Sequence, residues 1–230
     1  MKKNIVITGI TKGIGKSIAK KFYNADFQII GCSSNPLNVN NFLIEFPNAD
    51  VQTVNLSYKN EVIQWGEYIN QKYSSIEILV NNAGKFIPGQ IHNEEDGILE
   101  HLLQVNLQSA YYLTRTLLPK FIEQKNGSIF NICSTASIKP YLNGGSYCIS
   151  KFALLGFTKL LREEMKPYGV RVTGILPGAT LTDSWNGVDL PNQRFIQPED
   201  LANLIFTIYQ LPYTTVVEEL LIRPLLGDIE

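Results

Sequence analysis

The sequence predicts an α/β fold in which a doubly wound parallel sheet is covered by helices on both faces, as a three-layer sandwich. Two observations predict it. Short runs rich in β-branched residues alternate with longer segments of helical periodicity, which is the pattern of successive βα units. Several of the short runs, such as residues 76–81 and 128–133, are almost continuously apolar, as strands buried on both faces are.

The elements follow one another in βα order along the chain. We expect seven strands, at residues 4–8, 27–32, 50–54, 76–81, 128–133, 171–176 and 216–222. The first is an apolar run that ends at Gly9. Helical periodicity predicts six helices, at residues 13–25, 39–46, 59–73, 95–123, 147–166 and 198–210. Residues 180–197 lack clear periodicity, and a segment of this length is usually a lid or a binding loop. Because no linker or repeat divides residues 1–230, we expect one domain with a substrate loop at about 180–197.

Composition excludes several classes of protein. With 44% hydrophobic and 18% charged residues, the chain can bury a large core, so disordered and fibrous classes are excluded. A net charge of -1 gives no basic field for phosphate backbones, and we expect no nucleic-acid partner. No apolar run approaches the ~20 residues that cross a bilayer, so no membrane association is expected.

The cysteines and histidines argue against a disulfide framework and against a metal site. The three cysteines, Cys32, Cys133 and Cys148, form an odd set without CxxC spacing, which favours a reduced cytoplasmic location. The two histidines, His92 and His101, belong to no recognisable ligand cluster. We therefore expect a cytoplasmic protein without a metal.

A glycine-rich loop follows the first predicted strand. Residues 8–15 read TGITKGIG, with glycines at 9, 13 and 15, and lead directly into a predicted helix. This is a variant of the dinucleotide-binding fingerprint in its strand–turn–helix context, where missing side chains let backbone amides approach a pyrophosphate. Plain βα turns also use glycines, so the loop leaves both interpretations open.

The end of the second predicted strand bears on which dinucleotide would bind. NAD sites usually place an acidic residue there to hold the ribose 2′-OH. Here the positions are Ser33, Ser34 and Asn35, without a carboxylate that would repel an additional phosphate. Together with Lys12 of the glycine loop, these residues favour NADP(H) over NAD(H).

Tyr147 and Lys151 are four residues apart in a predicted helix, so they lie on one helix face, where a lysine could bias the ionisation of the tyrosine. Alone, this spacing is also common on ordinary helix surfaces. Taken with TGITKGIG, NNAG at 81–84, Ser134 thirteen residues before Tyr147, Asn106 in LQVNLQSA and PGATLT at 177–182, it resembles the short-chain dehydrogenase/reductase family over essentially the whole chain.

The resemblance implies a Rossmann-like seven-stranded sheet and the catalytic set Asn106, Ser134, Tyr147 and Lys151. Reduction of a carbonyl by hydride from nicotinamide leaves an alkoxide that needs a proton, and Tyr147 would act as that general acid and as the base in reverse. The Lys151 ammonium and oxidised nicotinamide would favour the tyrosine anion, and Lys151 would also hold the ribose. Ser134 would donate to the substrate oxygen, and Asn106 would bind a water that links Lys151 to solvent.

The resemblance also implies where the cofactor would lie. Ile14 would pack below it, Thr182 would contact the nicotinamide carboxamide, and Asn81 would brace the strand ends. The family commonly has an aspartate near adenine, and Asn55 stands here instead, which weakens that role without removing it. The implied cofactor-binding residues are Gly9, Thr11, Lys12, Gly13, Ile14, Gly15, Ser33, Ser34, Asn35, Asn55, Leu56, Asn82, Ala83, Gly84, Tyr147, Lys151, Pro177, Gly178, Thr180 and Thr182.

The substrate pocket is expected after NNAG, after Ser134 and in the loop 180–197. The expected lining residues, which suggest an apolar or aromatic-tolerant pocket, are Phe86, Tyr141, Leu142 and Trp185. These aromatic residues could equally pack the lid, and the sequence does not decide between the two. Arg194 is the one candidate to clamp a substrate carboxylate.

The leading hypothesis is therefore an NADP(H)-dependent oxidoreductase that acts on a small carbonyl or alcohol substrate. The resemblance further implies a homodimer or homotetramer, in which the helices that contain Asn106 and Tyr147 pair with a second copy. Two alternatives stay open. One is a 3-oxoacyl-carrier-protein reductase, disfavoured because the ending VVEELLIRPLLGDIE lacks that group's glycine-rich sequence. The other is a non-catalytic nucleotide-sensing or scaffolding protein on the same fold.

Overall fold

A seven-stranded parallel sheet forms the centre of the molecule, as the sequence predicts. The computed structural model describes residues 2–229. The strands pair in the order β3-β2-β1-β4-β5-β6-β7, and every pairing is parallel. Their bounds are β1 (Asn4–Thr8), β2 (Gln28–Ser33), β3 (Asp50–Thr53), β4 (Ile78–Asn81), β5 (Gly127–Ile132), β6 (Val170–Pro177) and β7 (Glu219–Ile222).

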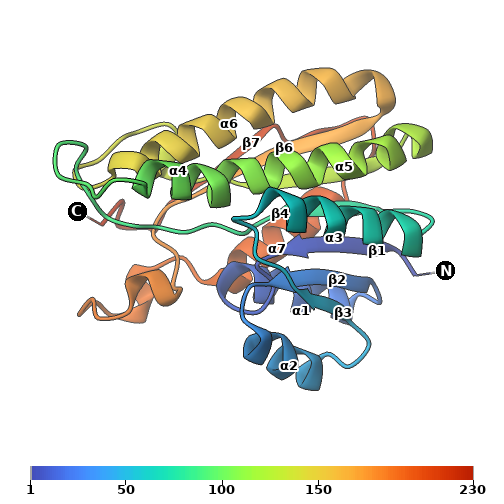
Figure 1. Ribbon diagram of the computed structural model, residues 1–230, viewed down its shortest axis with the longest axis horizontal. Helices are drawn as coiled ribbons and strands as arrows, with labels where there is room; N and C mark the ends of the chain where they lie inside the picture. The colour runs from blue at the N-terminus through green and yellow to red at the C-terminus, as the bar shows by residue number, and fades with distance from the viewer. Residues whose placement is uncertain (1, 230) are drawn as a thin grey trace.

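Helices cover both faces of this sheet, which gives the Rossmann-like three-layer arrangement (Figure 1). The α-helices are α1 (Gly13–Asn24), α2 (Pro36–Glu45), α3 (Lys59–Lys72), α4 (Ile98–Leu103), α5 (Ser109–Gln124), α6 (Gly145–Met165) and α7 (Pro198–Tyr209). A π-helical turn, η1 (Gln104–Gln108), joins α4 to α5. Short 3₁₀ turns are η2 (Thr135–Ser137), η3 (Lys166–Tyr168), η4 (Asp183–Trp185) and η5 (Asn192–Arg194).

The core is divided between the two faces by the alternation of strand side chains. In β1, Ile5 and Ile7 point to the face covered by α1, α2 and α7, where they join Phe22 and Ile205. The intervening Val6 belongs to the opposite cluster with residues of α3, α5 and α6. Strands sandwiched in this way are apolar on both faces, which is why their sequences are continuously apolar.

The structure corrects the predicted helix 95–123. The helix begins at Ile98, because Gly97 precedes it with φ +89°, a left-handed conformation that does not continue a helix. It is also not uniformly α-helical, since the π turn η1 interrupts it. Helix α2 begins at Pro36, three residues before the predicted start, because Asn35 caps it by accepting hydrogen bonds from Leu37 and Asn38.

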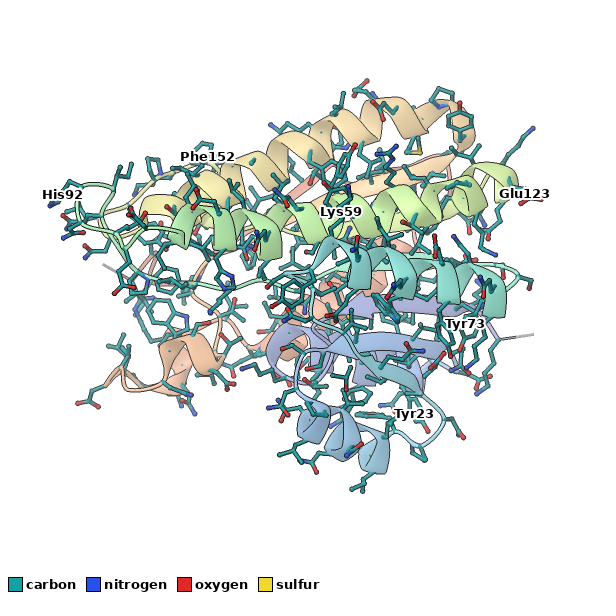
Figure 2. The ribbon with its side chains drawn as sticks, viewed as in Figure 1. Tyr23, Lys59, Tyr73, His92, Glu123 and Phe152 are labelled. Carbon is teal, nitrogen blue, oxygen red and sulfur yellow. The ribbon has the colours of Figure 1, made fainter. Side chains whose placement is uncertain are left out.

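The carboxyl ends of all strands meet at one end of the molecule. In Figure 1 the loop before α4, in green, and the segment after β6, in orange, both project at this end. Tyr73 and Glu123 lie at the opposite end (Figure 2). In open parallel sheets, ligands bind outside the carboxyl ends, where the strand order reverses, and here that point lies between β1 and β4. Across residues 2–229, no helix has the length and apolar character needed to span a bilayer.

Candidate active site

The loop between β1 and α1 is shaped by its glycines. Gly9 adopts φ +65° and Gly13 φ +51°, in the left-handed region that favours glycine. A Cβ on Gly15 would lie 2.4 Å from the Gly9 carbonyl oxygen and 2.5 Å from Nδ2 of Asn82, so this position accepts only glycine without movement. The first turn of α1 has neither a side-chain cap nor an acidic residue. Its amides and positive end therefore fit the pyrophosphate of a dinucleotide.

The NNAG segment ties strand ends together beside this loop. Asn81 donates from Nδ2 to Oδ1 of Asn131 at 2.8 Å, which links β4 to β5. Asn82 donates to the Thr8 carbonyl oxygen at 2.9 Å, and the Thr8 hydroxyl accepts the N–H groups of Asn82 and Ala83. The prediction that Asn81 braces the strand ends is confirmed, and Asn82 braces β1 against β4 in the same way.

Lys151 and Asn106 converge on Gly84. Lys151 is only 4% exposed, and it donates from Nζ to the carbonyl oxygen of Ile132 at 2.9 Å. Asn106, in the π turn, is 1% exposed, and its Oδ1 accepts the N–H of Lys85 at 2.7 Å. A Cβ on Gly84 would lie 3.4 Å from both Asn106 Oδ1 and Lys151 Nζ. The lysine and the asparagine, 45 residues apart in the sequence, are therefore neighbours.

Ser134 lies two residues after the end of β5, where its side chain caps the turn η2. Its Oγ accepts the N–H of Ala136 at 3.1 Å, and Oγ of Ser137 accepts the N–H of Ser134 at 3.1 Å. These bonds fix the turn that carries Ser134, and the Ser134 side chain lies near enough to Tyr147 to influence its pKa. Nζ of Lys151 lies 5.9 Å from the centre of the Tyr147 ring. The four residues of the predicted catalytic set are thus gathered in one place.

Burial shifts the ionisation of both the tyrosine and the lysine. Desolvation raises the pKa of Tyr147 to about 12, and the nearby Ser134 side chain lowers it only in part. Desolvation also lowers the pKa of Lys151 to about 8. The expectation that the Lys151 ammonium and oxidised nicotinamide together favour the tyrosine anion concerns the cofactor-bound state and stays a prediction. In the protein alone, desolvation is the largest influence on the pKa of each group.

The end of β2 places the predicted cofactor-preference residues beside the glycine loop. Thr11 donates from Oγ1 to Oγ of Ser33 at 3.0 Å. Ser34 and Asn35 follow and are exposed, and Oδ1 of Asn35 caps α2, which leaves its amide group free to donate. Lys12 is exposed and forms an ion pair with Asp183 at 2.8 Å.

At the adenine-side position, Asn55 already uses its side chain within its own turn. Its Oδ1 accepts the N–H of Ser57 at 3.1 Å, and its own N–H donates to Glu61 at 2.7 Å. Leu56 packs against the core on the α3 face, and Ile14 packs against the core on the α1 face. The amide oxygen that we expected to face adenine therefore has a partner in the protein.

The PGATLT segment leads from β6 to the glycine loop. Gly178 donates its N–H to the Ile222 carbonyl oxygen at 2.8 Å, and Thr180, 5% exposed, donates to the Gly178 carbonyl oxygen at 3.0 Å. A Cβ on Gly13 would lie 3.1 Å from Cγ2 of Thr182. Pro177 ends β6 itself, so these residues border the space above the glycine loop.

The four predicted substrate residues lie in three places. Phe86 packs edge-on against Tyr147, with ring centres 5.0 Å apart. Tyr141 and Leu142 line a hollow of about 710 Å³ between the loop before α4 and the start of α6. His92 and Phe152, which border the same hollow, mark its position in Figure 2. Trp185 packs against Phe195 within the lid, with ring centres 5.2 Å apart.

Arg194 is occupied by the chain's own carboxyl-terminal segment. Its guanidinium donates to the carbonyl oxygens of Gly227 and Asp228, each at 2.8 Å. Asp228 is in turn bound by Arg223. The guanidinium considered for a substrate carboxylate therefore has partners within the protein.

Sequence reasoning missed two side chains that support this site. Ser150, 0% exposed, accepts a hydrogen bond from Nδ2 of Asn106 at 2.9 Å and donates to the Tyr147 carbonyl oxygen at 2.7 Å. Glu94 accepts hydrogen bonds from Ser146 at the start of α6. The sequence contains no signal for Glu94, because its partner is 52 residues away. Ser150 lies three residues after Tyr147, and that spacing could have suggested its place.

Comparison with known proteins agrees with this fold. A family model described as short chain dehydrogenase matches residues 3–192. A sepiapterin reductase of Chlorobaculum tepidum is 32% identical over 100% of this chain and 99% of its own. An uncharacterized oxidoreductase of Staphylococcus saprophyticus is 30% identical over 96% of this chain and 97% of its own.

Solved structures give the same result. A metagenomic short-chain oxidoreductase in complex with NADP superposes with a TM-score of 0.85 at 26% identity, over 96% of each chain. An alcohol dehydrogenase of Thermococcus sibiricus shares the fold, with a TM-score of 0.90 at 20% identity over 100% of each chain. Fold and site thus define an oxidoreductase with a dinucleotide-binding sheet. The chain belongs to the short-chain dehydrogenase/reductase family.

Proposed function

We propose that this chain is an NADP(H)-dependent reductase that transfers hydride between nicotinamide and a carbonyl or alcohol substrate, with Tyr147 as general acid and base. The observation that carries the proposal is the convergence of Tyr147, Ser134, Lys151 and Asn106 at the carboxyl ends of β4 and β5. Bound nicotinamide would supply the hydride. The chain's own residues would hold the substrate oxygen and move the proton.

The protonation state of Tyr147 is compatible with its role as general acid in carbonyl reduction. With its pKa raised to about 12, the phenol is protonated at neutral pH, which is the form that gives a proton to a developing alkoxide. Ser134 would donate its hydroxyl proton to the same oxygen, because its Oγ already accepts the N–H of Ala136 and is oriented by it.

Lys151 would replace the proton that Tyr147 gives up. Its pKa of about 8 places proton gain and loss near neutral pH, so it can exchange a proton at little cost. Its hydrogen bond to Ile132 holds the ammonium at the end of β5. Asn106 next to it would hold a water on the route to solvent, as the family resemblance implies.

NADP(H) is proposed over NAD(H) from the residues around the second strand. Ser33, Ser34 and Asn35 offer hydroxyl and amide groups without a carboxylate, and Lys12 offers a cation that a phosphate could take from Asp183. A solved relative at 26% identity is in complex with NADP, which supports the proposal. The other cofactor residues proposed are those of the glycine loop, NNAG and PGATLT.

The proposed substrate is an uncharged carbonyl compound, bound in a site that is lined in part by aromatic side chains. Phe86 stands at the edge of Tyr147, and Arg194, the candidate carboxylate clamp, is bound to the chain's own backbone. A relative at 32% identity is named sepiapterin reductase, so sepiapterin belongs in the first set of compounds to test.

The test follows NADPH absorbance with ketones, aldehydes, quinones, pterins including sepiapterin, and 3-oxoacyl thioesters. Tyr147→Phe should lower kcat by about a hundredfold or more while the Kd for NADPH stays unchanged, because only the proton donor is lost. Unchanged turnover in this variant would overturn the assignment. Tighter binding of NADH than of NADPH would overturn the cofactor preference. Cofactor binding without turnover of any compound would favour a nucleotide-sensing protein.

We further propose a homo-oligomer built on α5 and α6. The outer faces of these helices carry exposed apolar side chains, among them Tyr111, Phe152 and Leu160, of which Leu160 is 60% exposed. Apolar groups in such positions are commonly covered by a second subunit. Light scattering should give the mass of a dimer or tetramer, and a monomer would contradict the proposal.

A further inference from the structure

Glu94, in the loop between β4 and α4, caps the amino end of α6. Its Oε1 accepts the backbone N–H of Ser146 at 2.9 Å, and its Oε2 accepts the Ser146 hydroxyl. Ser146 is 3% exposed and immediately precedes Tyr147. The carboxylate is therefore bonded to the residue next to the proposed proton donor.

Helix α6 has no other side chain for this purpose. Its N-cap position is Gly144, which has no side chain to cap the helix, and the first turn contains no acidic residue. The first amides of a helix lack partners within the helix, and a carboxylate near them is favoured by the helix dipole. Glu94, from a loop that is distant in the sequence, supplies the carboxylate acceptor that the residues at the start of α6 lack.

Two glycines make the space that the carboxylate fills. A Cβ on Gly145 would lie 2.0 Å from Oε1 of Glu94, and a Cβ on Gly89 would lie 2.6 Å from its Cγ. Neither position could carry a larger residue without displacing Glu94. A cradle of this kind indicates that the carboxylate has a defined place.

The loop around Glu94 is also joined to the segment before α6. Gly89 donates its N–H to the Asn143 carbonyl oxygen at 3.0 Å, and Gln90 donates to Oδ1 of Asn143 at 2.7 Å. Gly89 and Gly144 form a parallel β-bridge. Because Phe86 on this loop contacts Tyr147, the loop and the first turn of α6 form two sides of the same space.

We propose that Glu94 is a positioning residue, which fixes the first turn of α6 and so sets where the Tyr147 hydroxyl lies relative to Ser134. The inference rests on the proposed function, since it assigns Glu94 to the reaction of Tyr147. Misplacement of a reacting group by about 1 Å can cost about a hundredfold in rate. Loss of the cap acts on that distance and leaves the cofactor contacts in place.

The test compares Glu94→Ala and Glu94→Gln with Glu95→Gln, a change at the exposed neighbouring carboxylate. Glu94→Ala should lower kcat by about ten- to a hundredfold, with the KM for NADPH within about twofold. Glu94→Gln keeps one oxygen acceptor for Ser146 and should recover most of that loss. Glu95→Gln should match the wild type. A role in folding alone would reduce the folded fraction and leave kcat per folded molecule unchanged, which would overturn the inference.

Hydrogen–deuterium exchange of the peptide that spans residues 144–149 gives a readout that needs no substrate. Exchange there should be faster in Glu94→Ala, because the Ser146 N–H loses its acceptor, and unchanged in Glu95→Gln. Unchanged exchange in Glu94→Ala would show that the cap is not formed and would overturn the inference. If the wild-type chain turned over none of the compounds, the proposed function would fail, and the positioning role of Glu94 would fail with it. The exchange experiment would still show whether Glu94 caps α6.

Discussion

The buried layer under the proposed active site and the lid segment, residues 180–197, are held in opposite ways. In the buried layer, Asn106 and Lys151 are 1% and 4% exposed, and each is hydrogen-bonded to backbone groups of a neighbouring element. In the lid, Asp183 forms an ion pair with Lys12 of the glycine loop. The Asp183 side chain is 61% exposed and the Lys12 side chain is 67% exposed. Trp185 and Phe195 of the lid pack on each other.

This difference concerns how much free energy it costs to displace the side chains of each region. Removing one partner of a buried hydrogen bond costs about 1–3 kcal/mol, whereas an exposed ion pair is worth about 0–1 kcal/mol. The groups that would move a proton are therefore expensive to displace. The exposed part of the lid around Asp183 can move at little cost, as binding and release of a cofactor require, whereas Phe195 and Ile196 at the end of the lid are buried.

Substitution of Lys151 tests whether the buried layer takes part in the reaction or is only structural. Lys151→Met replaces the buried cation with an apolar chain of similar length, so the protein should stay folded. The loss of kcat should be about a thousandfold, because the proton relay and the ribose contact go together. Steady-state kinetics beside circular dichroism would measure both, and a folded variant with wild-type kcat would contradict the buried layer's role.

The same variant gives a prediction about stability and pH. The pKa of Lys151 falls from 10.5 to about 8 on folding, so between these values the unfolded chain holds a proton that the folded chain has released. The contribution of Lys151 to stability should therefore rise by up to about 3 kcal/mol as pH increases through this range. The raised pKa values of the Cys32 and Cys133 thiols act in the opposite direction above pH 9, and that of Tyr147 does so above pH 10. The contribution of Lys151 is therefore measured as the difference between the wild type and Lys151→Met.

Lys151→Met should lack this rise, which urea unfolding of both chains below pH 8 and near pH 10 would measure. Equal changes in the two chains would show that the wild-type lysine is not desolvated in the folded state.

Substitution of Gly15 tests whether the glycine loop is packed as tightly as the buried layer. Gly15→Ala should lower stability by about 1–3 kcal/mol and weaken NADPH binding, because its Cβ would meet the Gly9 carbonyl oxygen at 2.4 Å. Gly156→Ala in α6 is the matched control, since nothing of its own subunit lies within 4 Å of its Cβ. That change should stabilise by about 0.5–1 kcal/mol. Because Gly156 lies between Phe152 and Leu160 on the proposed subunit interface, the comparison requires that light scattering give both variants the wild-type mass. Equal effects of the two substitutions on unfolding would refute the prediction.

The smallest effect is expected at the exposed ion pair of the lid. Asp183→Asn should change the free energy of unfolding by less than about 1 kcal/mol. Lys12→Ala should be equally mild in stability yet raise the Kd for NADPH about tenfold, with the Kd for NADH within about twofold, since only NADPH carries the additional phosphate. Fluorescence titration with both cofactors would measure this, and equal losses for the two would contradict the assignment of Lys12.

The sheet could be predicted because its signals are local. Residues 4–8 were predicted as a strand and form β1, and the apolar run before Asn81 forms β4. The convergence of Asn106, Ser134, Tyr147 and Lys151 needed the family resemblance, because spacing along the chain relates only Tyr147 to Lys151. Those residues do meet, and their chemical roles stay proposals.

What the sequence could not supply depends on contacts between distant segments. LQVNLQ at 103–108 has an ordinary helical pattern, and nothing local marks the π turn. The partner of Glu94 lies 52 residues away. The desolvation that raises the pKa of Tyr147 likewise depends on the packing of distant segments, which the sequence does not reveal.

The π turn η1 sets where Asn106 lies along this helix. A π turn holds one more residue than an α turn, so the additional residue is taken up within the turn and the helices on either side keep their faces. Asn106 lies in that turn, with its Oδ1 bonded to the Lys85 N–H. Deleting one residue within Gln104–Gln108 should therefore leave α4 and α5 packed as they are and move only the residues of the turn. A single deletion would thus displace Asn106 without any change to its side chain.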